Sequence, residues 1–412
     1  MASDVPSVPV TRPLERRLRS LYAVAGMETA ALLPFFALWM SGRGLTPDRI
    51  GYVVAAGSLA GVVAAPIWSS VADERLGGGR TLVISSLGAF LAALALIPTD
   101  SNVWAIGVGV VVWGAVAAPG TALADSLALA ILGPARETEF GRVRRWASVG
   151  WAGAVVVFGA WFQSRGLSSM LPLYAALMLC YAAVASGLIA GAPPVTAADP
   201  QTGGRPRRPL GAVGDAFRAS PRMLPFLAGL FLVSTANAAA NTFLPLRIVA
   251  KGGGPLLIGI SLGIGAVIEI PFFAAAPWLG ERASQRALFA AGVAIWVVMF
   301  LDWSLTGNPT AVAAIRTLGG AGFGLIYAAL VVITGRLVPE HLRNTGQALM
   351  WTVSWGLAPM VGNALGGLVY VHLGASVLFL VAGVFAAAGA VVVWTALSGG
   401  ESSRAGVPAL EG

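Results

Sequence analysis

Charged residues are scarce in this chain, and their scarcity excludes a water-soluble protein. Only 11% of the 412 residues are charged and 57% are hydrophobic, whereas a soluble globular domain carries about 25% charged residues. So few charges could not cover the surface of a soluble chain of this length. Lipid must therefore be the solvent for most of it, and we expect an integral membrane protein that contacts the bilayer.

Cysteine and histidine are nearly absent as well. The single cysteine, Cys180, cannot form an intramolecular disulfide. The two histidines, His341 and His372, lie between predicted spans, and no catalytic or metal-binding cluster occurs inside the predicted membrane segments. We therefore expect no metal, no cofactor and no membrane-embedded enzyme. The absence of a phosphate-binding loop also argues against ATP-driven transport by this chain.

Hydrophobic residues are gathered in runs of roughly 20, the length of helix that crosses about 30 Å of hydrocarbon. Membrane helices tolerate the 53 glycines and 25 prolines, and glycine lets two helices approach closely. The Gly57-x-x-x-Gly61 and Gly362-x-x-x-Gly366 pairs are interpreted as such close-packing faces. The pattern predicts an all-α membrane protein with twelve transmembrane helices. The spans lie near 20–40, 50–71, 81–98, 103–129, 143–162, 171–190, 223–244, 257–279, 286–303, 310–335, 345–370 and 376–397.

Positive charge is concentrated on one side of these spans. If the N-terminus is inside, most of the 26 basic residues fall in cytoplasmic segments, and this bias predicts that both termini are cytoplasmic in the inner membrane. The N-terminus is a polar, arginine-containing arm followed by a full span, so no cleavable signal peptide is expected. This bias also explains the pI near 10.5, so no nucleic-acid partner is needed. The outer loops would hold Arg43, Arg49, Arg165, Arg247 and Lys251.

A polar stretch divides the chain into two six-helix halves. Residues 192–220 contain paired prolines, paired glycines and several arginines, which predicts a flexible cytoplasmic linker between residues 1–191 and residues 221–412. The halves echo each other weakly, because Asp73 and Glu281 occupy matching places just beyond the second and eighth spans. A parallel repeat of this kind predicts a substrate site near the midplane between the halves, opened alternately to each side.

Three segments carry a family resemblance. LPFFALWMSGRGLTPDRIG (33–51), EFGRVRRWASVGW (139–151) and GAVIEIPFF (265–273) resemble helices one, five and eight of the phenylpropionate-permease and lactose-permease-like groups of the major facilitator superfamily. The resemblance implies a monomeric transporter of pseudo-symmetric halves. The superfamily signature after the second helix is degraded here, and Asp73, Arg80 and Glu281 are interpreted as a structural latch between helices.

Glu269 is the strongest candidate for function among the ionisable residues inside the spans. A charge at the bilayer centre costs at least ~3 kcal/mol on insertion scales, so such residues are rare and usually functional. Glu269 lies mid-span among apolar residues, and we expect it to bind substrate and to exchange a proton. The alternative is a structural ion pair with Arg316, which lies within the tenth span.

Asp125 and Arg144 lie near the inner ends of the fourth and fifth spans. In lactose permease a carboxylate and an arginine at matching places hold the sugar, and the resemblance implies the same role here. An arginine fork suits a carboxylate or hydroxyl groups, so it does not choose the substrate. The alternative is an interfacial arginine, since Arg142 and Arg145 flank Arg144.

Polar residues on two further spans are candidates. Glu28 in the first span could line a cavity and carry a proton, or pair with another helix. Asn237 and Asn241 share one face of the seventh span and could either bind substrate or join helices.

The tenth span departs from lactose permease. Where that protein carries a histidine and a glutamate after a basic residue, this chain has Gly319 and Gly322. If protons drive transport here, Glu269, Asp125 or Glu28 must carry them. Aromatic residues that could line a cavity, or simply pack, are Phe35, Phe36, Trp39, Trp146, Trp151, Phe272 and Phe273.

These patterns predict a secondary transporter that moves a small organic solute by proton symport. A sugar or drug efflux carrier and an uncoupled facilitator stay open, because the residues do not set the direction of transport. A transporter-like receptor is the alternative outside transport, but such a protein would normally carry an additional cytoplasmic domain.

Overall fold

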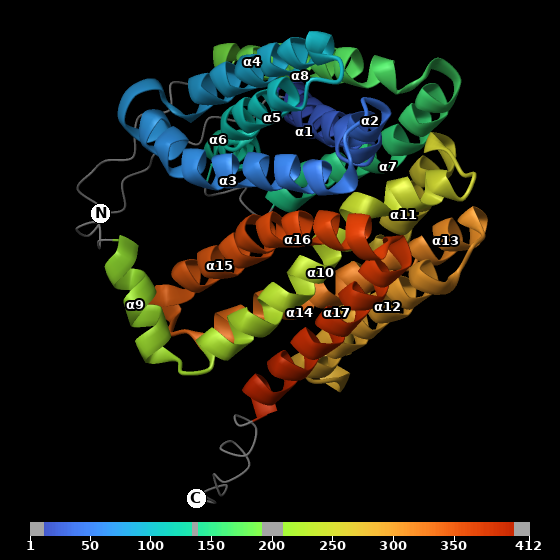
Figure 1. Ribbon diagram of the computed structural model, residues 1–412. Helices are drawn as coiled ribbons and strands as arrows, with labels where there is room; N and C mark the ends of the chain where they lie inside the picture. The colour runs from blue at the N-terminus through green and yellow to red at the C-terminus, as the bar shows by residue number, and fades with distance from the viewer. Residues whose placement is uncertain (1–11, 134–138, 192–208, 399–412) are drawn as a thin grey trace, which may run out of the picture. The chain divides into compact units, whose positions relative to one another are not determined.

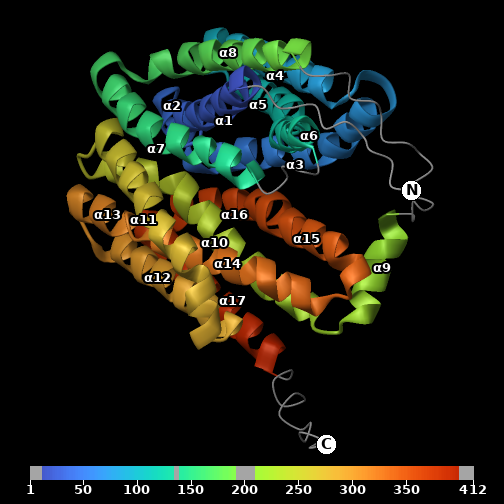
Figure 2. The same cartoon turned by 180° about the vertical axis from the view of Figure 1, so that it is seen from behind.

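The computed structural model describes residues 12–133, 139–191 and 209–398, and this part of the chain is built from helices and their connections, without β-strands (Figures 1 and 2). The helices of the first half are α1 (Arg12–Leu32), α2 (Phe36–Gly42), α3 (Pro47–Val71), α4 (Gly78–Leu96), α5 (Val103–Ala117), α6 (Gly120–Leu132), α7 (Phe140–Arg165) and α8 (Met170–Gly191). Those that follow are α9 (Pro209–Ala219), α10 (Met223–Ala250), α11 (Pro255–Arg282), α12 (Gln285–Leu305), α13 (Pro309–Arg316), α14 (Gly319–Leu337), α15 (Arg343–Trp351), α16 (Ala358–Leu373) and α17 (Ala375–Ser398). Single π-helical turns, Ala72–Leu76 and Thr352–Leu357, follow α3 and α15.

Eleven helical segments in the described residues are long and apolar enough to cross a membrane. The predicted span near 143–162 is not among them. At 26 residues, α7 is nevertheless about 39 Å long, which exceeds the hydrocarbon thickness. When α7 is included, the described ranges contain the twelve transmembrane helices expected from the sequence.

The chain forms two compact units, and each is described by itself. The first comprises Met1–Gly204 and Pro245–Ile264, and the second comprises Arg205–Leu244 and Gly265–Gly412. In the first unit α1 packs against α7 and α8, and α4 against α5 and α8 (Figure 2). In the second, α12 packs against α14 and α17 (Figure 1). The predicted halves stay a prediction, and α10 and α11 each contribute to both units.

Glycines allow helix backbones to touch at the crossings. A Cβ on Gly57 would lie 2.9 Å from Cγ1 of Val110 on α5. A Cβ on Gly362 would overlap the carbonyl of Thr235 on α10. Neither position has room for a side chain, and the interpretation of these glycine pairs as close-packing faces is confirmed.

Three predicted spans are interrupted, which the hydrophobic runs did not indicate. The first breaks at Pro34 between α1 and α2, and the fourth at Pro119 between α5 and α6. Proline lacks an N–H and cannot continue the hydrogen-bond ladder. The tenth breaks at Thr317 and Leu318, before two glycines. Broken membrane helices expose backbone groups that line sites in many transporters.

The predicted flexible linker contains a helix. Its last part, Pro209–Ala219, forms α9, which packs against α15 within the second unit. Proline at the first helical position is compatible with this helix because its missing N–H would be unpaired there anyway. The remainder of the linker, residues 192–208, lies outside the described residues.

Candidate functional site

Asp125 and Arg144, predicted as a pair from the resemblance, are brought together in the first unit. Arg144 Nε on α7 lies 3.3 Å from Asp125 Oδ1 on α6, and the side chains are 44% and 26% exposed. A second donor comes from α1, where the Tyr22 hydroxyl donates to Asp125 Oδ1 at 2.7 Å. Tyr22 is almost fully buried. The Asp125 carboxylate on α6 is therefore positioned by contacts from two other helices, α1 and α7.

Glu28 lies on the same helix as Tyr22 and belongs to the same region. Its Oε1 accepts a hydrogen bond of 2.9 Å from the Thr29 hydroxyl. Tyr181 on α8 lies close enough to both Glu28 and Asp125 for electrostatic interaction. We call Tyr22, Glu28, Asp125, Arg144 and Tyr181 the N-terminal polar cluster. The sequence analysis did not predict the two tyrosines, although hydroxyls within apolar runs were an available signal.

Glu269 and Arg316 form the corresponding charged group of the second unit. Glu269 lies at the middle of α11 and Arg316 at the last residue of α13, and the two side chains interact electrostatically. Arg316 Nε is buried without a hydrogen-bond partner among the described residues. An arginine with an unused donor in the membrane retains capacity to bind a solute group.

The crossing of α11 and α14 explains why these two charges approach each other. A Cβ on Gly320 would overlap the Gly265 carbonyl and lie 3.0 Å from the Glu269 nitrogen. Any side chain at Gly320 would therefore push α11 away from the break that presents Arg316.

The departure from lactose permease in the tenth span has a packing reason. A Cβ on Gly322 would lie 2.7 Å from the Trp296 indole on α12. A Cβ on Gly319 would overlap the Arg316 guanidinium. These positions are filled by a tryptophan and an arginine, so there is no space for the histidine and glutamate of that relative.

Asn237 and Asn241 bond to each other along α10. The Asn241 amide donates to Asn237 Oδ1 at 2.7 Å and to the Asn237 carbonyl at 2.9 Å. Both residues are half-buried. Because the donor is engaged within its own helix, these contacts do not join α10 to a neighbour.

Asp73, Arg80 and Glu281 lie apart from these groups. All three are exposed, and Glu281 pairs with the adjacent Arg282 at 3.6 Å. No ion pair between Asp73 and Arg80 is found within the described residues. Exposed pairs contribute little, about 0–1 kcal/mol, and the latch stays a prediction.

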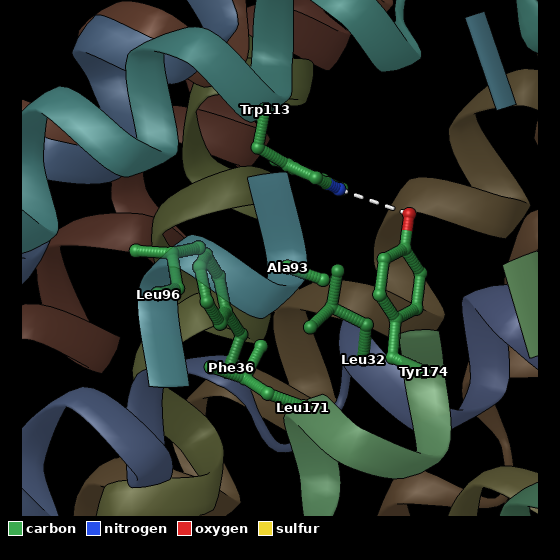
Figure 3. A pocket seen from close by; sticks show the side chains of 7 residues that line it. All are labelled: Leu32, Phe36, Ala93, Leu96, Trp113, Leu171 and Tyr174. Carbon is green, nitrogen blue, oxygen red and sulfur yellow. Dashed lines mark hydrogen bonds between the residues drawn. The ribbon is translucent and has the colours of Figure 1, made fainter. Parts of the chain in front are cut away.

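A small apolar pocket, too narrow to hold a water molecule, lies in the first unit (Figure 3). Figure 3 shows Trp113 Nε1 donating to the Tyr174 hydroxyl at 2.9 Å across its upper part. No charged side chain lines it, so it is a gap in packing beside the polar cluster. The lining residues are Leu32, Phe36, Ala93, Leu96, Trp113, Leu171 and Tyr174.

Comparison with known proteins agrees with this architecture. Residues 16–381 match the model of the MFS_1 like family. The chain is 26% identical to the maltose permease of Geobacillus stearothermophilus, over 82% of this chain and 83% of that protein. It is also 26% identical to the "Probable 3-phenylpropionic acid transporter" of Escherichia coli K12, over 85% of this chain and 89% of that protein.

Solved structures show the same fold. The nucleoside transporter NupG aligns with a TM-score of 0.78 at 18% identity, covering 93% of this chain and 98% of that one. A bacterial homolog of the human lysosomal transporter Spinster aligns at 0.69 and 15% identity, covering 95% and 97%. The resemblance stated from the sequence segments is therefore confirmed.

Proposed function

Because the chain belongs to the MFS_1 like family of membrane transporters, we propose that it is a secondary active transporter coupled to protons. It moves a small organic solute across the cytoplasmic membrane by alternating access of two helical halves. The observation that carries the proposal is the presence of three carboxylates, Glu28, Asp125 and Glu269, within helices that lipid surrounds. Such groups are expensive to insert and mark ion or substrate pathways.

The N-terminal polar cluster supports a role in holding the solute. Arg144 offers planar N–H donors beyond the Nε that faces Asp125, and such a fork binds carboxylate or hydroxyl oxygens well. Asp125, fixed by Tyr22, offers an acceptor beside it. The cluster therefore presents donors and acceptors together, which suits a polar solute with oxygen substituents. Asn237 and Asn241 on α10 are proposed as further substrate contacts through their amide groups.

Glu269 is proposed as the principal proton carrier and as a substrate contact. It interacts electrostatically with Arg316, but the two side chains form no salt bridge in the described part of the chain. Its carboxyl is therefore not held in a single closed contact. A proton can then compete with the arginine for the carboxylate, and solute binding can change that competition. Arg316 would act in gating by changing its distance to Glu269.

The test is uptake by purified protein in proteoliposomes with an imposed inward proton gradient. The solute would first be chosen by a thermal-shift screen against aromatic acids, nucleosides and sugars. Glu269→Gln is expected to abolish gradient-driven accumulation while solute exchange at equal concentration persists, because the amide cannot carry the proton. Arg282→Gln, an exposed charge change on the same helix, serves as the control and should accumulate solute normally.

Unchanged accumulation by Glu269→Gln would remove this residue as the carrier and move the assignment to Asp125 or Glu28. If the wild-type protein exchanges solute but a proton gradient does not drive its accumulation, the uncoupled facilitator is favoured. Outward accumulation under the cellular gradient would favour the efflux carrier, and solute binding without any flux would favour the receptor.

A further inference from the structure

Five aromatic rings gather around the crossing of α11, α14 and α15 in the second unit. We define the aromatic wall as Phe273, Phe323, Tyr327, Trp351 and Trp355. The wall is continuous: Phe273 meets Phe323 and Tyr327 edge to face with centroids 6.2 and 5.7 Å apart, and Tyr327 meets Trp351 at 5.9 Å. Of these rings, the sequence analysis had selected only Phe273.

The wall leaves ring faces uncovered. Trp351 and Trp355 stack with ring centroids 6.0 Å apart and an angle of 29° between the ring planes, and they are 39% and 57% exposed. The indoles of Trp113, Trp296 and Trp303 donate their N–H to protein oxygens, whereas the N–H of the buried Trp39 has no partner among the described residues. No such bond is found for Trp351 or Trp355 within the described ranges, so both indoles keep a free N–H donor.

Depth in the membrane separates this wall from an interfacial aromatic belt. Trp355 lies near the middle of its span, Glu340–Leu373, and Phe323 near the middle of Pro309–Leu337. Tryptophans that anchor a protein to lipid headgroups lie at the two interfaces. A free indole N–H at mid-depth would be costly against hydrocarbon because lipid tails cannot accept it.

The wall also shares a helix face with the mid-membrane carboxylate. Phe273 follows Glu269 by four residues on α11, which places the two on one face. That face is turned away from lipid, since a carboxylate facing hydrocarbon is strongly disfavoured. The rings that contact Phe273 therefore lie beside the helix face that carries Glu269.

The π-helical turn Thr352–Leu357 adds a further polar atom at this place. The Ser354 hydroxyl, between the two tryptophans in sequence, is buried without a hydrogen-bond partner in the described part of the chain. Single π-turns inside α-helices frequently occur at functional sites. The turn also sets Trp355 on the wall beside Trp351.

We propose that the aromatic wall is the subsite for a planar aromatic or heteroaromatic ring of the transported solute, which stacks on Trp355 and reaches Glu269 with its polar substituents. The inference rests on the proposed transport function and names its substrate class. Stacking on an aromatic platform contributes enough to lower affinity roughly tenfold when the platform is removed. A saturated ring of similar size lacks the flat face and therefore gains less binding free energy from stacking on Trp355.

The experiment measures binding to the wild-type protein in lipid nanodiscs with matched probes. 3-Phenylpropionate and adenosine are the anionic and neutral aromatic probes, 3-cyclohexylpropionate is the saturated match, and maltose is the non-aromatic solute. At least one aromatic probe is expected to bind, and 3-cyclohexylpropionate to bind more weakly than 3-phenylpropionate. Trp355→Ala should weaken the bound aromatic probe about tenfold or more, and Trp355→Phe should keep most of the affinity.

Trp278→Ala is the matched control. Trp278 is 55% exposed, nearly as much as Trp355, but it lies under Arg282 near the end of α11 and outside the wall. Equal effects of the Trp355 and Trp278 variants, equal binding of the two propionates, or no binding of any aromatic probe would each overturn the proposal. Proton-driven maltose uptake with no aromatic binding would overturn the ring subsite alone, whereas absence of flux for every solute would overturn the transport function.

Discussion

At the scale of single residues, Asp125 shows how a carboxylate is accommodated in a membrane helix. Its Oδ1 receives the Tyr22 hydroxyl at 2.7 Å and faces Arg144 Nε at 3.3 Å. A hydrogen bond to an ionised carboxylate is roughly twice as strong as a neutral one, and the ion pair with Arg144 adds to it from another helix. Both Arg144 and its neighbour Arg142 are exposed, but Arg144 is the one that pairs with Asp125.

Conservative replacement of the two arginines should separate these roles. Arg144→Lys is expected to weaken solute binding about tenfold, because lysine loses the planar donors while keeping the charge. Arg142→Lys should change binding less than about twofold, since a positive charge at the interface is all that this position supplies. Isothermal titration with the solute from the thermal-shift screen gives both affinities. Equal losses of affinity in the two variants would indicate that Arg144 is an interfacial arginine without a role in solute binding.

At the scale of elements, helix crossings depend on glycine at a few positions. On α7, a Cβ at Gly150 would overlap the Ala23 carbonyl of α1, while a Cβ at Gly153 would meet nothing within 4 Å. The first glycine is buried and the second exposed. This crossing also carries Tyr22 and Arg144, so its spacing sets the geometry of the polar cluster.

Alanine at these two positions makes a matched pair on one helix. Gly150→Ala is expected to cost about 1–3 kcal/mol through overpacking and to lower the thermal unfolding midpoint in detergent. Gly153→Ala should leave the midpoint unchanged or raise it, because alanine favours the helix. Fluorescence-detected size-exclusion after heating measures both. A midpoint for Gly150→Ala equal to the wild type would show that the two helices separate easily.

At the scale of the whole molecule, the chain is a multi-pass membrane transporter whose helices are interrupted at Pro34, at Pro119 and before Gly319. The breaks on α1/α2 and α13/α14 lie close in sequence to Glu28 and Arg316. Ionisable side chains and irregular backbone therefore occur in the same helices, as expected where backbone groups line a cavity.

The orientation of the molecule is predicted from its basic residues and can be measured with fusions. Green fluorescent protein at the C-terminus should fluoresce, because that end is predicted to be cytoplasmic. Alkaline phosphatase fused after Gly253, in the predicted outer loop between α10 and α11, should be active because it needs an oxidising compartment. The reverse pattern of activities would invert the predicted topology.

The sequence by itself determined that this is a multi-pass membrane protein. The length of a hydrophobic run decides whether a helix can cross the bilayer, and this does not depend on any tertiary contact. It also predicted Asp125 and Arg144 as a pair through the family resemblance. Tertiary structure decided what depends on distances between helices. Only the tertiary structure brought Tyr22 and Tyr181 into the N-terminal polar cluster. It also showed that Trp296 fills the space beside Gly322, and that rings from three helices meet in the aromatic wall. Such contacts join residues far apart in the chain, and no local pattern records which faces of two helices will meet.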